Sequence, residues 1–140
     1  MKGEIIDVES PYGNKDKKIV ARNIRFARAC LRDCLLKGEI PFASHLLYTQ
    51  SGILDDEINY ERILGINAGK TLIKNANRTV VYDNYGISNG MIFGIENAKK
   101  SGRPVEYRAL PNNWEEQQNE IVRHHSDSGL WGIILENPKS

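Results

Sequence analysis

Short apolar runs alternate along the chain with longer segments in which apolar residues recur every three or four positions. The predicted strands and helices fall, in order, at residues 4–9 (strand), 17–37 (helix), 40–43 (strand), 57–75 (helix), 79–82 (strand), 88–100 (helix) and 104–107 (strand). Strands that alternate with helices through short links are typical of a parallel sheet. The pattern therefore predicts an α/β fold in which helices cover both faces of a parallel sheet.

Each predicted helix has an apolar face that we expect to be buried. In the first helix, which Gly38 ends, this face consists of Val20, Ile24, Ala27, Leu31, Cys34 and Leu35. In the second helix it consists of Ile63, Ile66, Leu72 and Ile73, while Ala68 and Gly69 allow another segment to approach closely. In the third helix, which begins at Ser88 and ends at Ser101–Gly102, it consists of Met91, Ile95 and Ala98.

The chain changes character after residue 108. The predicted segments are, in order, a turn at 111–113, a polar helix at 114–123, a loop at 124–129 and a last strand at 130–135. We therefore expect a domain at residues 1–108 and an extension at residues 109–140 that packs on this domain or on a neighbouring subunit. His124 and His125 are adjacent, and no second ligand pair is visible, so we expect no metal site there.

Composition and charge narrow the function classes. The 140 residues, 40% of them hydrophobic, suffice for one domain with a core, and the formal charge of +1 provides no electrostatic footprint for duplex DNA or an anionic membrane. No apolar run approaches the ~18 residues of a membrane span. Residues 1–4 lack a signal-peptide pattern, so we expect a cytosolic protein. Cys30 and Cys34 lie four apart with no nearby His and are expected to be reduced, half-buried thiols.

Polar residues follow the first two predicted strands. Ser10–Asn14 forms a turn whose side chains can bond their own backbone or a ligand above the strand end. The segment Ser44–Gln50 is predicted to be a loop, and it places His45 within five positions of Tyr48 and Gln50. Such a cluster suits a base or a ribose, and a structural His that caps the loop is the alternative.

Arginines occupy the polar side of the first helix, at Arg22, Arg25, Arg28 and Arg32. Arginines at this density form a solvated face in most helices. Those nearest the strand ends can instead bind a phosphate through two parallel hydrogen bonds. We therefore treat Arg22 and Arg28 as candidate anion partners.

The stretch from Arg78 to Ala98 is the expected floor of a site. It runs from a buried strand through a glycine-containing loop into a helix that starts at Ser88. Free N–H groups and the helix dipole favour a phosphate at such a crossing, so Ser88 and Gly90 are candidate phosphate binders. A helix cap followed by a flexible residue is the alternative. Tyr85 either stacks on a base or fills the loop.

With these segments in place, the chain resembles the nucleoside 2-deoxyribosyltransferase superfamily, most closely its small, often phage-encoded members of the 2-deoxynucleoside-monophosphate N-glycosidase kind. The matching segments, between residues 3 and 108, are Ser10–Gly13, Asn23 with Arg28, Ile40–Gln50, Tyr60–Arg62 with Leu64–Ile66, Ile87–Met91 and Gly102–Val105. The resemblance implies a Rossmann-like, flavodoxin-type sheet, a homodimer or larger assembly, no cofactor, and a nucleotide held at the carboxyl ends of the strands.

The residues expected to bind this ligand are Ser10, Pro11, Tyr12, Gly13, Asn14, Arg22, Arg28, His45, Tyr48, Gln50, Tyr85, Ser88, Asn89, Gly90 and Gly94. In relatives a neighbouring subunit often completes the site, which makes Arg103 and Arg108 candidates for a partner's pocket. No nucleic acid or membrane partner is expected.

The resemblance also implies that catalytic carboxylates are missing. In this superfamily a nucleophilic Glu stands six positions after the Ser that corresponds to Ser88, and that position is Gly94 here. Glu96 lies two residues further, a rotation of about 200° around the helix, and should point away. The two other acidic positions correspond to Gly69 and Asn77. We expect Gly94 to enlarge the cavity and to remove a negative charge, which suits a bulkier dianion such as ADP-ribose or its cyclic forms.

Three functions follow as hypotheses. The first is an inert nucleotide binder, in its concrete form a phage anti-defence sponge for a nucleotide immune signal such as cyclic ADP-ribose. The second is an active N-glycosidase or deoxyribosyltransferase that uses another carboxylate, for which Asp83 and Glu96 are candidates. The third is a structural or protein-binding role in which Trp114 and Trp131 bury against a subunit or a host protein.

Overall fold

The computed structural model describes residues 3–128, and it divides the chain into two compact units, Met1–Leu110 and Pro111–Ser140. The elements of the first unit are, in order, β1 (Ile5–Glu9), α1 (Lys17–Leu36), β2 (Ile40–Phe42), α2 (Ser44–Leu47), α3 (Asn59–Ile73), β3 (Arg78–Tyr82), α4 (Asn89–Lys100) and β4 (Val105–Arg108). The described element of the second unit is α5 (Trp114–Ser128).

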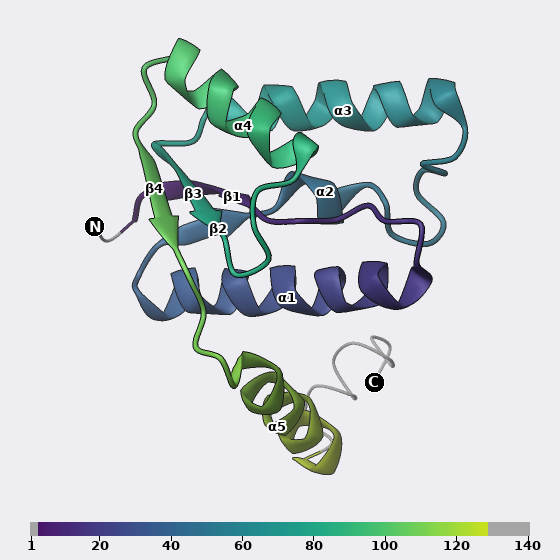
Figure 1. Cartoon of the computed structure of the whole chain (residues 1–140), viewed down its shortest axis with the longest axis vertical. Coiled ribbons are helices and arrows are strands. Elements are labelled where there is room, and N and C mark those ends of the chain that lie inside the picture. Colours follow the sequence, from purple (N-terminus) through teal and green to yellow (C-terminus); the bar gives the residue numbers. More distant parts are fainter. Residues whose placement is uncertain (1–2, 129–140) are drawn as a thin grey trace. The chain divides into compact units, whose positions relative to one another are not determined.

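The first unit is built on a four-stranded parallel sheet with the strand order β2-β1-β3-β4. Between the two central strands, Asp7 pairs with Thr79 and Glu9 pairs with Val81. In Figure 1, α1 lies on one side of the sheet, and α3 and α4 lie on the other. The predicted α/β fold with both faces covered is therefore confirmed.

One half of the core lies between the sheet and α1. Tyr82 is fully buried on this face, with its hydroxyl 3.3 Å from Cys34 Sγ, and it donates a hydrogen bond of 2.7 Å to Asp33 Oδ2. Side chains alternate along a strand, so Val80 and its β1 partner Val8 face the same side, and both are buried. The predicted apolar face of α1 is thus largely correct, but Leu35 is 60% exposed.

The other half of the core lies under α4. Val81 packs there with Met91 and Ile95, and Val105 of β4 packs against the cluster. The side chain of Ser88 caps the helix by accepting a hydrogen bond from the Met91 N–H at 3.3 Å. The predicted buried face of α4 and its start at Ser88 are confirmed.

Helix α3 is the main departure from the predicted pattern. Ile63 and Ile66 are each 47% exposed and Leu72 is 37% exposed, although they were expected to be buried, whereas Ile73 is buried as predicted. The buried residues of α3 are Gly69 and Ile73, and its contact is with α2, which forms where a loop was predicted. Gly69 allows the close approach, because a Cβ there would lie 3.2 Å from the Cβ of Ser44.

In the second unit, α5 continues to Ser128, so the loop predicted to begin at residue 124 is wrong. No Gly or Pro occurs between Trp114 and Ser128, and nothing in this stretch stops a helix. Glu115 and Glu116 lie in its first turn, where the helix dipole favours acidic residues. The strand predicted at residues 130–135 lies outside the described residues.

The two cysteines are fully buried rather than half-buried, and both are free thiols. Burial raises the pKa of the Cys30 thiol far above its ordinary value and raises the pKa of Cys34 to about 11. Across residues 3–128, no group of three or more His, Cys, Asp or Glu side chains is placed to hold a metal ion. Within the same residues, no helix has both the length and the apolar character that crossing a membrane requires.

Candidate functional site

Strands β1 and β3 lie side by side, and their following helices leave toward opposite faces of the sheet, as Figure 1 shows for α1 and α4. Open α/β sheets bind ligands outside the carboxyl ends of two such strands, and we call this place at the edge of the sheet the crevice. The loops that border this crevice are residues 10–16 after β1 and residues 83–88 after β3. Most of the residues predicted to bind ligand lie in these loops or next to them.

His45 joins the loop after β1 to the segment after β2. Its Nε2 lies 3.1 Å from Ser10 Oγ, a hydrogen bond whose direction depends on the His tautomer, and its ring centroid lies 5.7 Å from that of Tyr12. Burial lowers the pKa of His45 to about 4, so the ring is neutral at pH 7. A neutral imidazole that contacts a hydroxyl and an aromatic ring positions these groups rather than supplying charge.

The start of α1 is tied to the loop after β3. The guanidinium carbon of Arg22 lies 3.7 Å from the centroid of the Tyr85 ring, and Arg22 Nη2 donates a hydrogen bond of 3.0 Å to Asn23 Oδ1. Asn23 in turn donates from Nδ2 to the Tyr12 carbonyl at 2.9 Å, and the Tyr85 ring meets the edge of Phe26 at 5.0 Å. The Nε of Arg22 is buried without a hydrogen-bond partner among the described residues. Arg22 and Tyr85 therefore lie together at the crevice.

The remaining predicted ligand residues differ in exposure and in position. Pro11 is buried, and Asn14 accepts a hydrogen bond of 2.9 Å from the Asp16 N–H in the turn that starts α1. The residues exposed at or near the crevice are Gly13, Ser88, Asn89 and Gly90. Arg28 is exposed further along α1, and Gln50 is exposed and donates to the Leu47 carbonyl at 3.1 Å. Tyr48 is half-buried, with its Cβ near Gly65 of α3.

The position of Gly94 is occupied by another residue's carboxyl group. A Cβ at Gly94 would overlap the carboxyl carbon of Glu9 and would lie 2.5 and 2.6 Å from its two oxygens. Gly94 therefore leaves room for the Glu9 side chain, which reaches up from the carboxyl end of β1. The expectation that Gly94 makes the cavity roomier and less acidic is wrong, because an acidic side chain fills that space.

Glu9 and Asp7 form an acid pair, because residues two apart on a strand point to the same face. Their carboxyl groups hydrogen-bond to each other, which requires a proton on one of them. Asp7 Oδ2 accepts from Thr79 Oγ1 at 3.0 Å, and Asp7 Oδ1 is buried without a hydrogen-bond partner among the described residues. Burial and then the negative charge of Asp7 raise the pKa of Glu9 well above its ordinary value. The raised pKa of Glu9 favours its protonated form.

Arg103 is the countercharge of this pair. Its Nε donates a hydrogen bond of 2.8 Å to Thr79 Oγ1, so a line of contacts runs from Arg103 through Thr79 to Asp7 and Glu9. The pKa of Asp7 is raised by burial, against the opposing effects of Glu9, Thr79 and Arg103. The guanidinium thus favours the charged form of Asp7.

The two arginines expected in a partner's pocket are engaged within their own chain. Arg103 is only 9% exposed, and Arg108 donates two hydrogen bonds, of 2.8 and 2.6 Å, to the carboxylate of Glu39. This buried pair holds the pKa of Glu39 below its ordinary value, chiefly through the hydrogen bonds from Arg108. Asp83 and Glu96, the alternative catalytic carboxylates, are exposed.

Comparison with known proteins gives one family. The model of a family described as a domain of unknown function, DUF7768, matches residues 4–108, more than half of the 140 residues. The chain belongs to the DUF7768 family. No curated protein matches it.

A solved structure with a similar fold is the 2-deoxyribosyltransferase of the psychrotolerant bacterium Bacillus psychrosaccharolyticus. The two share 20% sequence identity with a TM-score of 0.54, over 82% of this chain and 90% of that one. The DUF7768 chain therefore has the fold of a deoxyribosyltransferase, as the resemblance implied.

Three residues of this site were not predicted, namely Asp7, Glu9 and Thr79, and Arg103 was predicted only as a candidate for a partner's pocket. A signal was available for the first two, because acidic residues two apart in an otherwise apolar strand must share one face. In a parallel sheet covered on both sides, that face is buried. No sequence pattern indicates that Glu9 reaches Gly94, because the two are far apart along the chain and meet only through the packing of α4 on the sheet.

Proposed function

We propose that this protein binds a 2′-deoxynucleoside 5′-monophosphate at the carboxyl edge of its sheet and cleaves the N-glycosidic bond, with Glu9 as the reacting carboxyl group. The observation that carries the proposal is the carboxyl group of Glu9 in the space beside Gly94. In the resembled superfamily the nucleophilic Glu stands at that helix position. The proposal is that the acid has moved from α4 to β1 while its carboxyl group remains at the same place.

The surrounding residues suit such a ligand. The crevice lies at the switch point between β1 and β3, and the first turn of α4 presents Ser88 and Gly90 to it. Tyr12 and Tyr85 offer aromatic rings for a base, and Arg22 offers a buried Nε without a hydrogen-bond partner among residues 3–128. The similar fold of a 2-deoxyribosyltransferase supports a nucleoside-like ligand.

The reaction has two steps. A carboxylate oxygen of Glu9 bonds to C1′ while the C1′–N bond breaks, and its electron pair leaves with the base, which takes a proton from solvent. Water then attacks C1′ and releases a proton to solvent, the C1′–O bond to Glu9 breaks with its electron pair returning to the carboxylate, and the products are the free base and deoxyribose 5-phosphate. Glu9 must lose its proton first, and Asp7 Oδ1 is placed to receive it. Asp7 is thus a positioning residue, which holds the proton that Glu9 releases.

The test is incubation with deoxynucleoside monophosphates followed by chromatography for free base. Glu9→Gln preserves the size of the side chain and should lower the rate of base release by about 1,000-fold or more. The double variant Asp83→Asn/Glu96→Gln removes the two exposed acids and should retain release. Equal release from Glu9→Gln and the unaltered protein would eliminate Glu9 as the reacting group.

Sequestration without cleavage is the second candidate, and one observation favours it. A proton held on Glu9 makes the carboxyl group a poor nucleophile, so a ligand can bind and remain intact. In its concrete form the protein is a phage anti-defence sponge that holds cyclic ADP-ribose in the host cytosol. Isothermal titration with cyclic ADP-ribose isomers, followed by recovery of unchanged ligand on heating, supports this candidate. Absence of binding to all isomers removes it.

Assembly into a homodimer or a larger oligomer is also proposed. Large apolar side chains are exposed on the outer helices, namely Tyr60, Ile63, Leu64, Ile66, Ile92 and Phe93. Phe93 is the most exposed of them at 75%, and burial of such side chains against a second subunit is favourable. Light scattering after size exclusion should show a smaller particle for Phe93→Ser if this face is the interface. A structural or protein-binding role of the second unit instead predicts that assembly depends on residues after Ala109.

A further inference from the structure

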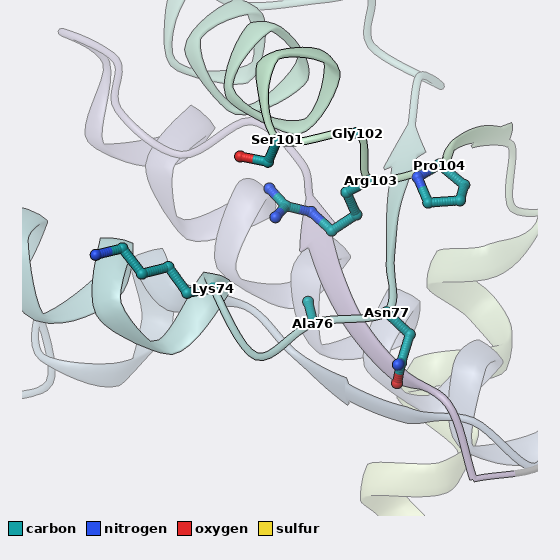
Figure 2. A pocket seen from close by; sticks show the side chains of 7 residues that line it. All are labelled: Lys74, Ala76, Asn77, Ser101, Gly102, Arg103 and Pro104. Carbon is teal, nitrogen blue, oxygen red and sulfur yellow. The ribbon is translucent and has the colours of Figure 1, made fainter.

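A cavity of about 370 Å³ opens at the amino edge of the sheet. The residues that line it lie between α3 and β3 and between α4 and β4. Asn77, for example, directly precedes β3, and Pro104 directly precedes β4 (Figure 2). The crevice around Glu9 lies at the carboxyl ends of the same strands. The cavity is therefore separate from the site of the proposed reaction.

Arg103 projects into this cavity with one unused donor. Its side chain is nine-tenths buried, at 9% exposure, and its Nε and Nη1 donate to Thr79 Oγ1 and to the Ile73 carbonyl at 2.8 and 3.4 Å. Its Nη2 is buried and has no hydrogen-bond partner among the described residues. In Figure 2 the guanidinium lies between the side chains of Ser101 and Ala76. A buried charged donor without a partner is costly, so a ligand that accepts from Nη2 gains strength.

The charge around the cavity is positive. Lys70 lies in the last turn of α3, and Lys99 and Lys100 lie in the last turn of α4, while Lys74 lines the cavity itself. None of these four lysines forms an ion pair within the described part of the chain.

Two features oppose an anion, and both are already compensated. The carboxyl ends of α3 and α4 carry partial negative charge, but Arg103 already binds the Ile73 carbonyl. The acidic side chain of Glu4 near this edge lies 3.4 Å from Arg78, with which it forms an ion pair. The local field therefore favours an anion.

The number of available donors indicates which anion. A planar carboxylate binds arginine best through two parallel hydrogen bonds, and here only Nη2 remains. A tetrahedral oxyanion accepts single hydrogen bonds from several directions, and the Ser101 hydroxyl lines the same cavity. In Figure 2 the Lys74 side chain extends away from Arg103, so it acts at longer range through its charge.

We propose that this cavity binds a phosphate group through Arg103 Nη2 and the Ser101 hydroxyl, with the surrounding lysines attracting it. This phosphate site is distinct from the proposed nucleotide site, and it does not depend on the proposed glycosidic reaction. Because Arg103 also contacts Thr79, an anion bound here shares its countercharge with the acid pair of Asp7 and Glu9.

The test is an NMR titration of the whole protein with inorganic phosphate, at constant ionic strength and without nucleotide, following the side-chain Nε–H signal of Arg103. A saturable shift is expected, and glycerol 3-phosphate in a second titration distinguishes a phosphate monoester from the free ion. Ser101→Ala and Lys74→Glu alter exposed side chains and should each weaken binding several-fold. Arg103→Met lacks this signal, so its binding is followed through the backbone N–H signal of Ser101. It should weaken binding about tenfold or more, because it removes a charge-assisted hydrogen bond.

Two controls locate the bound phosphate. Arg32→Ala removes one exposed charge from α1, on the side of the sheet opposite α3 and α4, and should leave the affinity within about twofold. Ser88→Ala removes a candidate phosphate binder of the nucleotide site, so unchanged phosphate affinity in this variant assigns binding to the amino edge. Loss of binding in Ser88→Ala together with unchanged binding in Ser101→Ala and Lys74→Glu would overturn the proposal. So would the absence of any saturable shift of the Arg103 signal.

Discussion

Replacing Gly94 by Ala tests the contact on which the proposed function depends. The added methyl group would lie 2.5 and 2.6 Å from the Glu9 carboxyl oxygens, whereas non-bonded heavy atoms pack at about 3.5–4.0 Å. The carboxyl must therefore move by roughly 1 Å. This movement also disturbs its hydrogen bond to Asp7.

The magnitude follows from opposing effects. Overpacking costs about 1–3 kcal/mol, and a weakened buried hydrogen bond adds about 1–3 kcal/mol. Exchanging Gly for Ala inside a helix stabilises by about 1 kcal/mol. We therefore expect Gly94→Ala to lower the free energy of unfolding by about 2 kcal/mol. Gly90→Ala in the same helix is the matched control, since nothing lies within 4 Å of its Cβ position, and it should be neutral or stabilising.

The assay is urea unfolding followed by circular dichroism, carried out as a double-mutant cycle. In a Glu9→Ala background the methyl group at position 94 has free space, so Gly94→Ala should stabilise rather than destabilise. Because Gly94→Ala should cost about 2 kcal/mol with Glu9 present and gain about 1 kcal/mol without it, a coupling energy of about 3 kcal/mol between the two positions is expected. If Gly94→Ala changes the free energy of unfolding equally with and without Glu9, or by the same amount as Gly90→Ala, the proposed contact between position 94 and Glu9 is contradicted.

Three further predictions concern titration, the acid's position and the thiols. The pKa of His45 is about 4 in the folded protein and about 6.5 in the unfolded chain. Between these pH values the unfolded state binds more protons, so up to about 3 kcal/mol of stability is lost as pH falls through this range. His45→Gln should flatten this pH dependence in thermal melts. Glu9 has the opposite effect, because its raised pKa contributes stability at low pH that is lost as pH rises, and Glu9→Gln should remove this trend. The exchange variant Glu9→Gly/Gly94→Glu returns a carboxyl to the same space from α4 and should restore base release relative to Glu9→Gly alone in the chromatographic assay. Cys30 and Cys34, buried with raised pKa values, should react with a thiol reagent only after unfolding in urea, and rapid reaction of the native protein would contradict their burial.

The fold was predictable because its signals are local. Periodic apolar residues predict α1 and α4. Ser88 caps the start of α4, and Gly38 follows the end of α1, and both residue types favour helix ends through local geometry. Prediction failed for α3, since an apolar face indicates that a helix can be buried but not that a surface is available to bury it. Ile63 and Ile66 are exposed because α3 turns Gly69 and Ile73 inward instead.

The candidate site was predictable only in part. The loops at Ser10–Asn14 and Ser88–Gly90 follow strand ends, and any parallel sheet brings such loops to one edge. The roles of single side chains were harder to predict. Arg22 lies on Tyr85 at the crevice, whereas Arg28, on the same helix, is exposed further along it.

The sequence alone determined that the residue at position 94 has no side chain and that Asp7 and Glu9 share one face of a strand, because both facts depend only on residue identity and strand geometry. Only the tertiary structure decided what fills the space beside Gly94. Helix α4 packs on the sheet closely enough for Glu9 to occupy that space, so the position that lacks an acid in the sequence has one in the fold. Whether position 94 carries a side chain follows from the sequence alone, but whether the space beside it is empty depends on the neighbouring residues that the fold brings to it.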